Sequence, residues 1–247
     1  MSHETLQSNL EVEIRFSADP AGLEVAARSD LLRAAAVEPA EELVSTYFDT
    51  PSRALRRDGV ALRLRAQGSG AALAQLKCAH GDGYDPFAQQ EIEAPAAGDA
   101  PDLSAFPSDV AQRLAQTIGE EPLSPQFTTF IQRSVRRLSR GGAEIEVAFD
   151  EGTIVAGGRK TPLRRLELEL KSGPIAELYA LACELAQAAP LRLEATTKAD
   201  LGFQLAEGTS ARPAKADKLA FAQDATVDDV TALILGSALS QFFTNMA

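Results

Sequence analysis

Charged and apolar residues alternate at the start of the chain, over residues 10–16, which read LEVEIRF. Side chains two residues apart share one face of a β-strand. The charged residues Glu11, Glu13 and Arg15 therefore lie on one face, and the apolar residues between them lie on the other. Such a strand can be an ordinary half-exposed strand of an antiparallel sheet, or it can direct two carboxylates toward a divalent cation.

The same alternation, or a run of β-branched and aromatic residues, predicts further strands along the chain. These strands are expected at 43–50, 60–66, 71–78, 87–94, 126–139, 143–150 and 163–171. Apolar residues at helical spacing predict helices at 20–28, 29–36, 52–58, 110–118 and 174–188. Glycine and polar residues predict a hairpin turn at 68–70 and a loop at 80–86.

The C-terminal part differs in composition from the rest of the chain. Residues 206–218 are polar and rich in Pro and Ala, which is typical of a linker. A further helix is expected to begin at Val227, with an apolar stripe of Leu233, Leu235, Leu239 and Phe242. We therefore divide the chain into a main domain at 1–205, a linker at 206–226 and the first helix of another unit at 227–247.

The polar faces of the predicted strands carry mostly Arg and Glu. These positions are Glu11, Glu13, Arg15, Arg63, Arg65, Gln75, Lys77, Glu91, Glu93, Arg133, Arg136, Glu144, Glu146, Asp150, Arg165, Glu167, Glu169 and Lys171. An open sheet would turn them to water, whereas a barrel would turn them inward and place its apolar outer face under the helices. Clustered acids and paired arginines favour the barrel, because they suit a multidentate anion and its metal. The pattern does not decide which of Arg133 and Arg136 faces inward.

The composition of the chain limits which binding partners and which cellular setting are expected. The net charge of −11 argues against general binding of nucleic acid. No apolar stretch approaches the roughly 18 residues of a membrane span, and no secretory signal is expected at the N-terminus. Cys78 and Cys183 have no metal-ligand or disulfide-framework spacing, which favours a reducing, cytoplasmic setting.

Eight short blocks occur in an order that resembles a known superfamily. The blocks are EVEIRF, STYFDT, GVALRLR, AQLK, QEIE, EIEVAFDEG, RRLELELKSG and TTKADLGF. Over residues 10–205 the chain resembles the CYTH superfamily, the triphosphate tunnel metalloenzymes. The segment from Val227 resembles the opening helix of a CHAD domain, so the chain is similar to bacterial inorganic triphosphatases of CYTH-CHAD architecture.

The resemblance implies an α+β fold, an eight-stranded antiparallel β-barrel tunnel with helices packed on the outside. It implies metal-dependent hydrolysis of inorganic triphosphate or polyphosphate to diphosphate and phosphate, with Mg²⁺ or Mn²⁺ as the cofactor. The implied metal ligands are Glu11, Glu13, Asp150, Glu167 and Glu169. The implied substrate-binding residues are Arg15, Arg63, Arg65, Lys77, Arg133, Arg136, Arg165 and Lys198, of which Arg15, Lys77, Arg63 and Arg65 are also the catalytic candidates.

The chain departs from the superfamily pattern at two positions. Arg15 stands where the opening signature normally has Lys, and Leu201 stands where the late block commonly has Arg. An arginine fork is not equivalent to a lysine ammonium, so substrate preference stays open. The alternatives are an adenylate cyclase or thiamine triphosphatase of the same fold, and a polyphosphate-binding module without turnover. The sequence does not assign a general base, and Tyr47 is a candidate either for positioning water or for packing.

Overall fold

The computed structural model describes residues 9–67, 72–79, 87–209, 215–216, 218–222 and 224–245. The predicted hairpin turn at 68–70 and the predicted loop at 80–86 lie outside the described residues, as does part of the predicted linker at 206–226.

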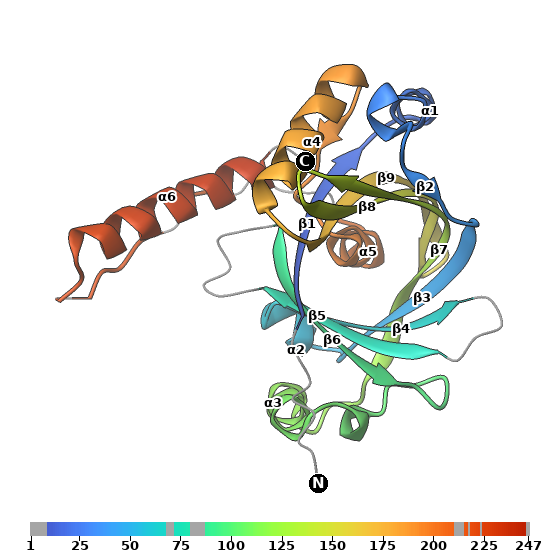
Figure 1. The fold of residues 1–247 in the computed structure, drawn as a ribbon. Coiled ribbons are helices and arrows are strands. Elements are labelled where there is room, and N and C mark those ends of the chain that lie inside the picture. The colour runs from blue at the N-terminus through green and yellow to red at the C-terminus, as the bar shows by residue number, and fades with distance from the viewer. Residues whose placement is uncertain are drawn as a thin grey trace, which may run out of the picture.

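Eight antiparallel strands close into a barrel (Figure 1). Their order around the barrel is β1-β6-β5-β4-β3-β7-β8-β9, and β9 pairs in turn with β1. The strands are β1 (Asn9–Ser17), β3 (Glu41–Asp49), β4 (Val60–Gln67), β5 (Leu73–Ala79), β6 (Ala88–Pro95), β7 (Ser124–Arg140), β8 (Ala143–Ala156) and β9 (Arg159–Ser172). Two short strands, β2 (Ala36–Val37) and β10 (Arg192–Leu193), pair with β7 and β1. The predicted barrel is confirmed over the open sheet.

Helices lie around the barrel. They are α1 (Pro20–Ala27), α2 (Ala54–Arg57), α3 (Ser108–Ile118), α4 (Ile175–Ala188), α5 (Lys198–Glu207) and α6 (Val227–Thr244), with short 3₁₀ turns η1 (Asp30–Leu32) and η2 (Leu103–Ala105). None of the helices in the described part of the chain is long and apolar enough to cross a lipid bilayer.

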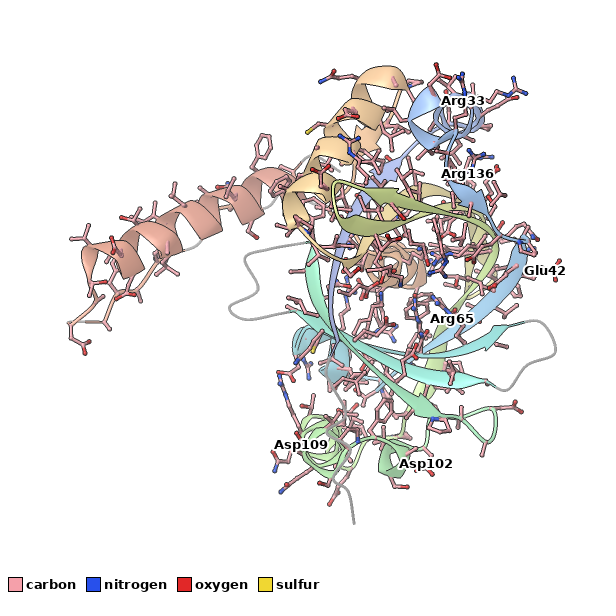
Figure 2. The ribbon with its side chains drawn as sticks, in the orientation of Figure 1. Arg33, Glu42, Arg65, Asp102, Asp109 and Arg136 are labelled. Carbon is pink, nitrogen blue, oxygen red and sulfur yellow. The ribbon has the colours of Figure 1, made fainter. Side chains whose placement is uncertain are left out.

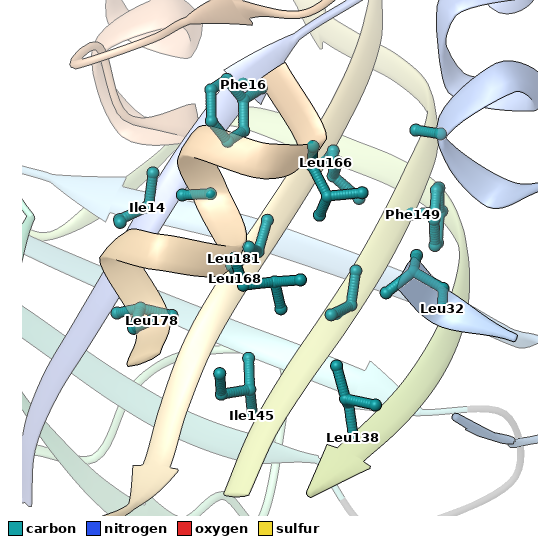
Figure 3. Packing of buried hydrophobic residues seen from close by; sticks show 14 of the residues in the cluster. Ile14, Phe16, Leu32, Leu138, Ile145, Phe149, Leu166, Leu168, Leu178 and Leu181 are labelled. Carbon is teal, nitrogen blue, oxygen red and sulfur yellow. The ribbon is translucent and has the colours of Figure 1, made fainter. Parts of the chain in front are cut away.

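The largest apolar core lies between α4 and the outer face of the barrel (Figure 3). Leu178 and Leu181 of α4 are fully buried against Leu166 and Leu168 of β9. The apolar positions of β9 alternate with its charged ones, so the strand presents leucines outward to α4 and charges inward. Burial of each such leucine contributes about 1.5–3 kcal/mol, which fixes the direction in which the charged face points.

A second core packs α2 and α3 against β4, β5 and β6. Leu62 and Leu76 point outward from the strands into this core, where Leu55 of α2 and Leu114 of α3 meet them. The charged residues that alternate with Leu62 and Leu76 consequently face the barrel interior.

Helix α5, seen end-on inside the ring of strands in Figure 1, packs against β7, β8 and β9 through a third apolar cluster. The ring of Phe203 meets that of Phe127 edge to face at 5.2 Å, and Phe127 stacks on Tyr47 at 4.4 Å. Gly202 permits this approach, because a Cβ atom there would lie 2.1 Å from the Phe127 ring. Helix α5 thus fills part of the space inside the ring of strands.

Three predicted elements differ from the structure. Residues 29–36 were expected to be helical, but they form the turn η1 and then β2, whose Ala36 and Val37 pair with β7. Backbone pairing with a neighbouring strand outweighs local helix propensity there. Strands β8 and β9 are also longer than predicted, since they continue to a two-residue turn at Gly157 and Gly158, where both φ angles are positive.

The predicted C-terminal helix forms, as α6. Its Phe243 contacts Phe87, the residue just before β6, with ring centroids 5.4 Å apart. Leu235, Leu239 and Phe242 of the predicted stripe are more than half exposed. The barrel therefore covers little of the apolar surface of α6.

Candidate active site

The barrel encloses a cavity of about 440 Å³ that charged side chains line from all sides. Cations on its wall are Arg15, Arg56, Arg63, Arg65, Lys77, Arg133, Arg137, Arg165, Lys171 and Lys198, and anions are Glu11, Glu13, Glu38, Glu41, Glu91, Glu93, Glu146, Glu167, Glu169 and Asp200. Of the residues proposed from the sequence as site residues, the structure brings all to this cavity or its ion pairs except Arg136.

Register between β1 and β9 brings the two acidic runs of the sequence together. Glu13 pairs with Glu169, and Arg15 pairs with Glu167, in one antiparallel ladder. Directly opposed side chains in such a ladder lie within about 5.5 Å of each other at Cβ. Residues more than 150 positions apart in the chain therefore share one patch of the cavity wall.

A buried ion network links β7, β8, β9 and α5. Arg133 donates from Nε and Nη2 to the two carboxylate oxygens of Asp150, each at 2.7 Å, and from Nη2 to Glu167 at 2.7 Å. Lys198 of α5 pairs with Asp150 at 2.8 Å and also with Glu167. Burial alone would raise the pKa of Glu167, but Lys198 and Arg133 hold it well below its usual range.

A second ion group lies on β1, β5 and β6. Lys77 Nζ donates to Glu11 Oε2 at 2.5 Å and lies 3.8 Å from Glu91. Arg63 Nη2 lies 3.6 Å from the same Glu91. Although burial opposes it, the negative charge of Glu11 and Glu13 raises the pKa of Lys77, so this lysine is firmly charged.

The wall formed by β3, β4 and β7 has more cations than nearby carboxylates neutralise. Arg65 has no carboxylate at salt-bridge distance among the described residues, and its Nε meets only the Ser45 hydroxyl, at 3.4 Å. Burial and the neighbouring charges of Arg63 and Arg133 lower the pKa of Arg65 to about 10. Arg63 donates to the Tyr47 hydroxyl at 3.1 Å, and its positive charge lowers the pKa of Tyr47 despite burial. The positive charge of this wall would stabilise a bound anion.

The wall formed by β1 and β9 has the opposite imbalance. Burial and the charge of Glu11 raise the pKa of Glu169 to about 7. Burial and the charge of Glu167 raise the pKa of Glu13. Carboxylates that raise one another's pKa values in this way would be stabilised by an added cation.

The predicted metal-ligand set is not assembled as a single centre. Across the part of the chain that the structure describes, no three His, Cys, Asp or Glu side chains converge closely enough to hold a metal ion. Asp150 and Glu167 are already bound by Arg133 and Lys198. The remaining predicted ligands, Glu11, Glu13 and Glu169, also have basic neighbours, in Lys77, Arg15 and Lys171. The pKa values of Glu13 and Glu169 are nevertheless raised, so a hard divalent cation would stabilise these carboxylates, whose chemistry it fits.

Arg136 was predicted to bind substrate, and the structure places it outside the cavity. It lies on the outside of the barrel, toward α1, whereas Arg65 points into the ring of strands (Figure 2). Arg136 Nη1 donates to the Ala27 carbonyl at 2.5 Å, and its guanidinium lies over the Phe149 ring at 5.4 Å. Arg133 faces the cavity, and a position three residues further along the same strand faces the opposite side.

Two arginines outside the predicted site, Arg137 and Arg56, also line the cavity. Arg137 pairs with Glu38 and with Glu146, the latter at 3.1 Å. Arg56 pairs with Glu207 and lies over the Phe203 ring at 4.9 Å. Arg137 could have been predicted from the sequence, because it lies four residues after Arg133 and therefore on the same face of the strand. Nothing in the local sequence pattern distinguishes Arg56.

Comparisons with known proteins agree with this geometry. Residues 9–203 match the CYTH domain. An inorganic triphosphatase from Haemophilus influenzae is 26% identical over 169 residues, which cover 66% of this chain and 46% of the relative. The chain thus spans less than half the length of that relative.

Two solved structures share the fold. One is a protein from Pyrococcus horikoshii, with a TM-score of 0.53 and 17% identity, covering 78% of this chain and 98% of the other. The other is a putative adenylyl cyclase from Hippeastrum, described as having a dominant triphosphatase activity, with a TM-score of 0.53 and 17% identity, covering 81% and 96%. The closed charged barrel and the match over most of the chain lead to one conclusion: this protein belongs to the CYTH domain family.

Proposed function

We propose that this chain hydrolyses inorganic triphosphate to diphosphate and phosphate in its barrel, with a divalent cation. The observation that carries the proposal is the split charge of the cavity: crowded cations on the β3–β4–β7 wall face crowded carboxylates on the β1–β9 wall. A polyanion that carries its own metal ion satisfies both walls at once, which neither a free anion nor a free cation does.

Phosphate oxygens would bind first to the cations that have fewest carboxylate partners. Arg65 and Arg63 present guanidinium forks, which bind phosphate oxygens in pairs. Lys77 on β5 supplies a point charge beside them. Arg133 and Lys198 are held in place by Asp150 and Glu167, so they are ordered for contact without rearrangement.

Glu11, Glu13 and Glu169 would hold the cation, and Asp150 and Glu167 would orient basic residues instead of binding metal. When bound, a divalent ion supplies charge neutralisation and a position for water. The sequence resemblance implies Mg²⁺ or Mn²⁺ for this role.

The reaction we propose is in-line attack of water on the terminal phosphorus. The bond from that phosphorus to the bridging oxygen breaks, and diphosphate leaves with the electron pair. Arg63 and Arg65 stabilise the charge that gathers on the leaving group, because they are fixed and partly or fully shielded from solvent. No general base is assigned.

An unsubstituted triphosphate fits better than a nucleotide. Among the described residues that line the cavity, Tyr47 and Phe203 are the aromatic ones, and Phe127 packs against the rings of both. Arg63 lies over the Tyr47 ring at 5.9 Å and Arg56 over the Phe203 ring at 4.9 Å, so both rings are already covered and are not available to stack on a base or a thiamine ring. The cations of the β3–β4–β7 wall also suit the dense negative charge of inorganic triphosphate or a longer polyphosphate.

The proposal is tested by phosphate release from tripolyphosphate with Mg²⁺, with Mn²⁺ and with chelator, beside ATP and thiamine triphosphate. We expect turnover of tripolyphosphate only with a divalent cation, and loss of about 100-fold or more in Glu13→Gln and Arg65→Met. Glu42→Gln, at an exposed position on the outside of β3, is the matched control and should retain full activity.

Three results would change the conclusion. Faster release from ATP or thiamine triphosphate than from tripolyphosphate would assign a substituted substrate. Tight binding of tripolyphosphate without turnover would assign a binding module. Equal activity in Glu13→Gln, Arg65→Met and Glu42→Gln would show that the reaction does not take place in this cavity.

A further inference from the structure

Two buried arginines donate hydrogen bonds to consecutive backbone carbonyls just before α5. Arg15 Nη2 of β1 donates to the Ala195 carbonyl at 3.1 Å. Arg165 Nη2 of β9 donates to the Thr196 carbonyl at 2.6 Å. The two arginines are 3% and 1% exposed, so these are charge-assisted bonds in a desolvated setting.

The segment that receives these bonds leads directly into the cavity. The Glu194 amide donates to the Arg15 carbonyl at 2.8 Å, which extends the pairing of β10 with β1. Thr197 then caps α5 by a reciprocal pair of bonds with Asp200. The next residue, Lys198, enters the ion network with Asp150 and Glu167.

We infer that Arg15 and Arg165 are positioning residues: they fix the start of α5 against the barrel and thereby place Lys198 in the cavity. Without them, the junction between the strands and α5 would depend on the two-residue ladder of β10, on the ion pairs of Lys198 and on the apolar packing of α5. The two guanidinium bonds join the helix start to two different strands, β1 and β9, at the point where those strands pair.

A guanidinium suits this task better than an ammonium, because its fork reaches two partners in fixed directions. Arg15 uses one nitrogen for Ala195 and directs Nη1 toward Glu13, at 3.5 Å. Arg165 uses one nitrogen for Thr196 and keeps Nη1 without a hydrogen-bond partner in the described structure. This gives a physical reason for arginine, in place of lysine, at the third charged position of the opening strand.

Amide hydrogen exchange of the metal-free and substrate-free protein tests the anchor directly. In Arg15→Lys and in Arg165→Lys we expect α5 amides to exchange about tenfold faster than in the unsubstituted protein, which corresponds to about 1.4 kcal/mol. Exchange in β4 and β5 should not change. Arg65→Lys is the matched control: it alters a buried arginine of the same cavity that has no bond to residues 194–197, so α5 exchange should stay as it was.

Steady-state kinetics give the second measurement. The consequence for catalysis rests on the proposed function: with α5 loosened, the KM for tripolyphosphate should rise about tenfold in Arg15→Lys, with a smaller change in kcat, because Lys198 is displaced on average. If exchange accelerates as expected but the unsubstituted protein releases no phosphate, the anchor stands and the proposed function fails.

Unchanged α5 exchange in Arg15→Lys would overturn the inference, even with phosphate release intact. Should Arg165→Lys fail to fold, Arg15→Lys decides alone. The unsubstituted protein offers a check that needs no variant: α5 amides about 100-fold less protected than those of α4 would show that the start of α5 is not held, and the inference would fall.

Discussion

Arg133 and Asp150 face each other across the β7–β8 ladder, and the guanidinium donates from Nε and Nη2 to both carboxylate oxygens at 2.7 Å. Asp150 is fully buried and also receives Lys198 at 2.8 Å. A carboxylate with these three donors is an internal counter-ion for two basic residues. Its role in the folded protein is therefore to hold cations at the cavity wall, and its removal would leave them with Glu167 as their remaining carboxylate partner in the described structure.

Asp150→Asn should destabilise the protein by about 3 kcal/mol, because it breaks a buried ion pair and leaves Glu167 to neutralise both Arg133 and Lys198. Urea unfolding of the metal-free protein measures this loss. Glu38→Gln is the control: its partner Arg137 is half exposed, so a loss of no more than about 1 kcal/mol is expected. A loss in Asp150→Asn as small as in the control would contradict the buried network.

Arg65→Met should separate binding from stability. Arg65 has no carboxylate partner in the described structure, so its burial is not offset by an ion pair. We therefore expect Arg65→Met either to lower the free energy of unfolding by less than about 1 kcal/mol or to increase it. The affinity for tripolyphosphate should fall about tenfold or more, as measured by calorimetric titration. Arg136→Met, on the outside of the same barrel, should leave the affinity unchanged. Similar losses of affinity in both variants would argue that binding depends only on net charge.

Glu169→Gln should change how stability depends on pH. The folded-state pKa of Glu169 is raised from 4.5 to about 7, so the folded protein holds this proton more tightly than the unfolded chain. The contribution is fully present below 4.5 and is lost as the pH rises through about 7. Metal-free Glu169→Gln should therefore gain stability over the unsubstituted protein between pH 5 and pH 8, on the order of 1 kcal/mol.

Urea unfolding across this pH range measures that gain, and an added divalent cation should reduce it. Glu42→Gln serves as the control, because Glu42 is exposed on the outside of the barrel. A difference between Glu169→Gln and the unsubstituted protein that does not vary with pH would show that Glu169 titrates normally.

Gly202→Ala tests how closely α5 packs against Phe127. In an unobstructed helix interior this change is favourable by about 1 kcal/mol. Here the added Cβ would lie 2.1 Å from the Phe127 ring, so we expect a net loss of about 1–3 kcal/mol in urea unfolding. Gly98→Ala is the matched control, since a Cβ there meets nothing within 4 Å. A more stable Gly202→Ala protein would mean that α5 does not approach Phe127 this closely.

The predicted division into 1–205, 206–226 and 227–247 stays a prediction, as does the resemblance of the last segment to a CHAD helix. The structure adds one observation, which is that Leu235, Leu239 and Phe242 of α6 are more than half exposed.

The local pattern of the chain determined which side chains share a strand face. On β1 and β9 the charged and apolar sets were assigned from the sequence, and the leucines of β9 do pack under α4 while its charges face the cavity. This works because side-chain direction in a strand depends only on position along the backbone.

Only the tertiary structure decided what each charge faces. Arg133 and Arg136 are indistinguishable as residues, and the barrel wall separates them because they sit on opposite faces of β7. In the sequence, Asp150 and Glu167 match the pattern of metal ligands. In the structure they form ion pairs with basic residues of β7 and α5. The raised pKa of Glu169 likewise comes from Glu11 and from burial. These outcomes depend on contacts between segments that are distant in the chain, and electrostatic energies in a desolvated cavity depend on those distances.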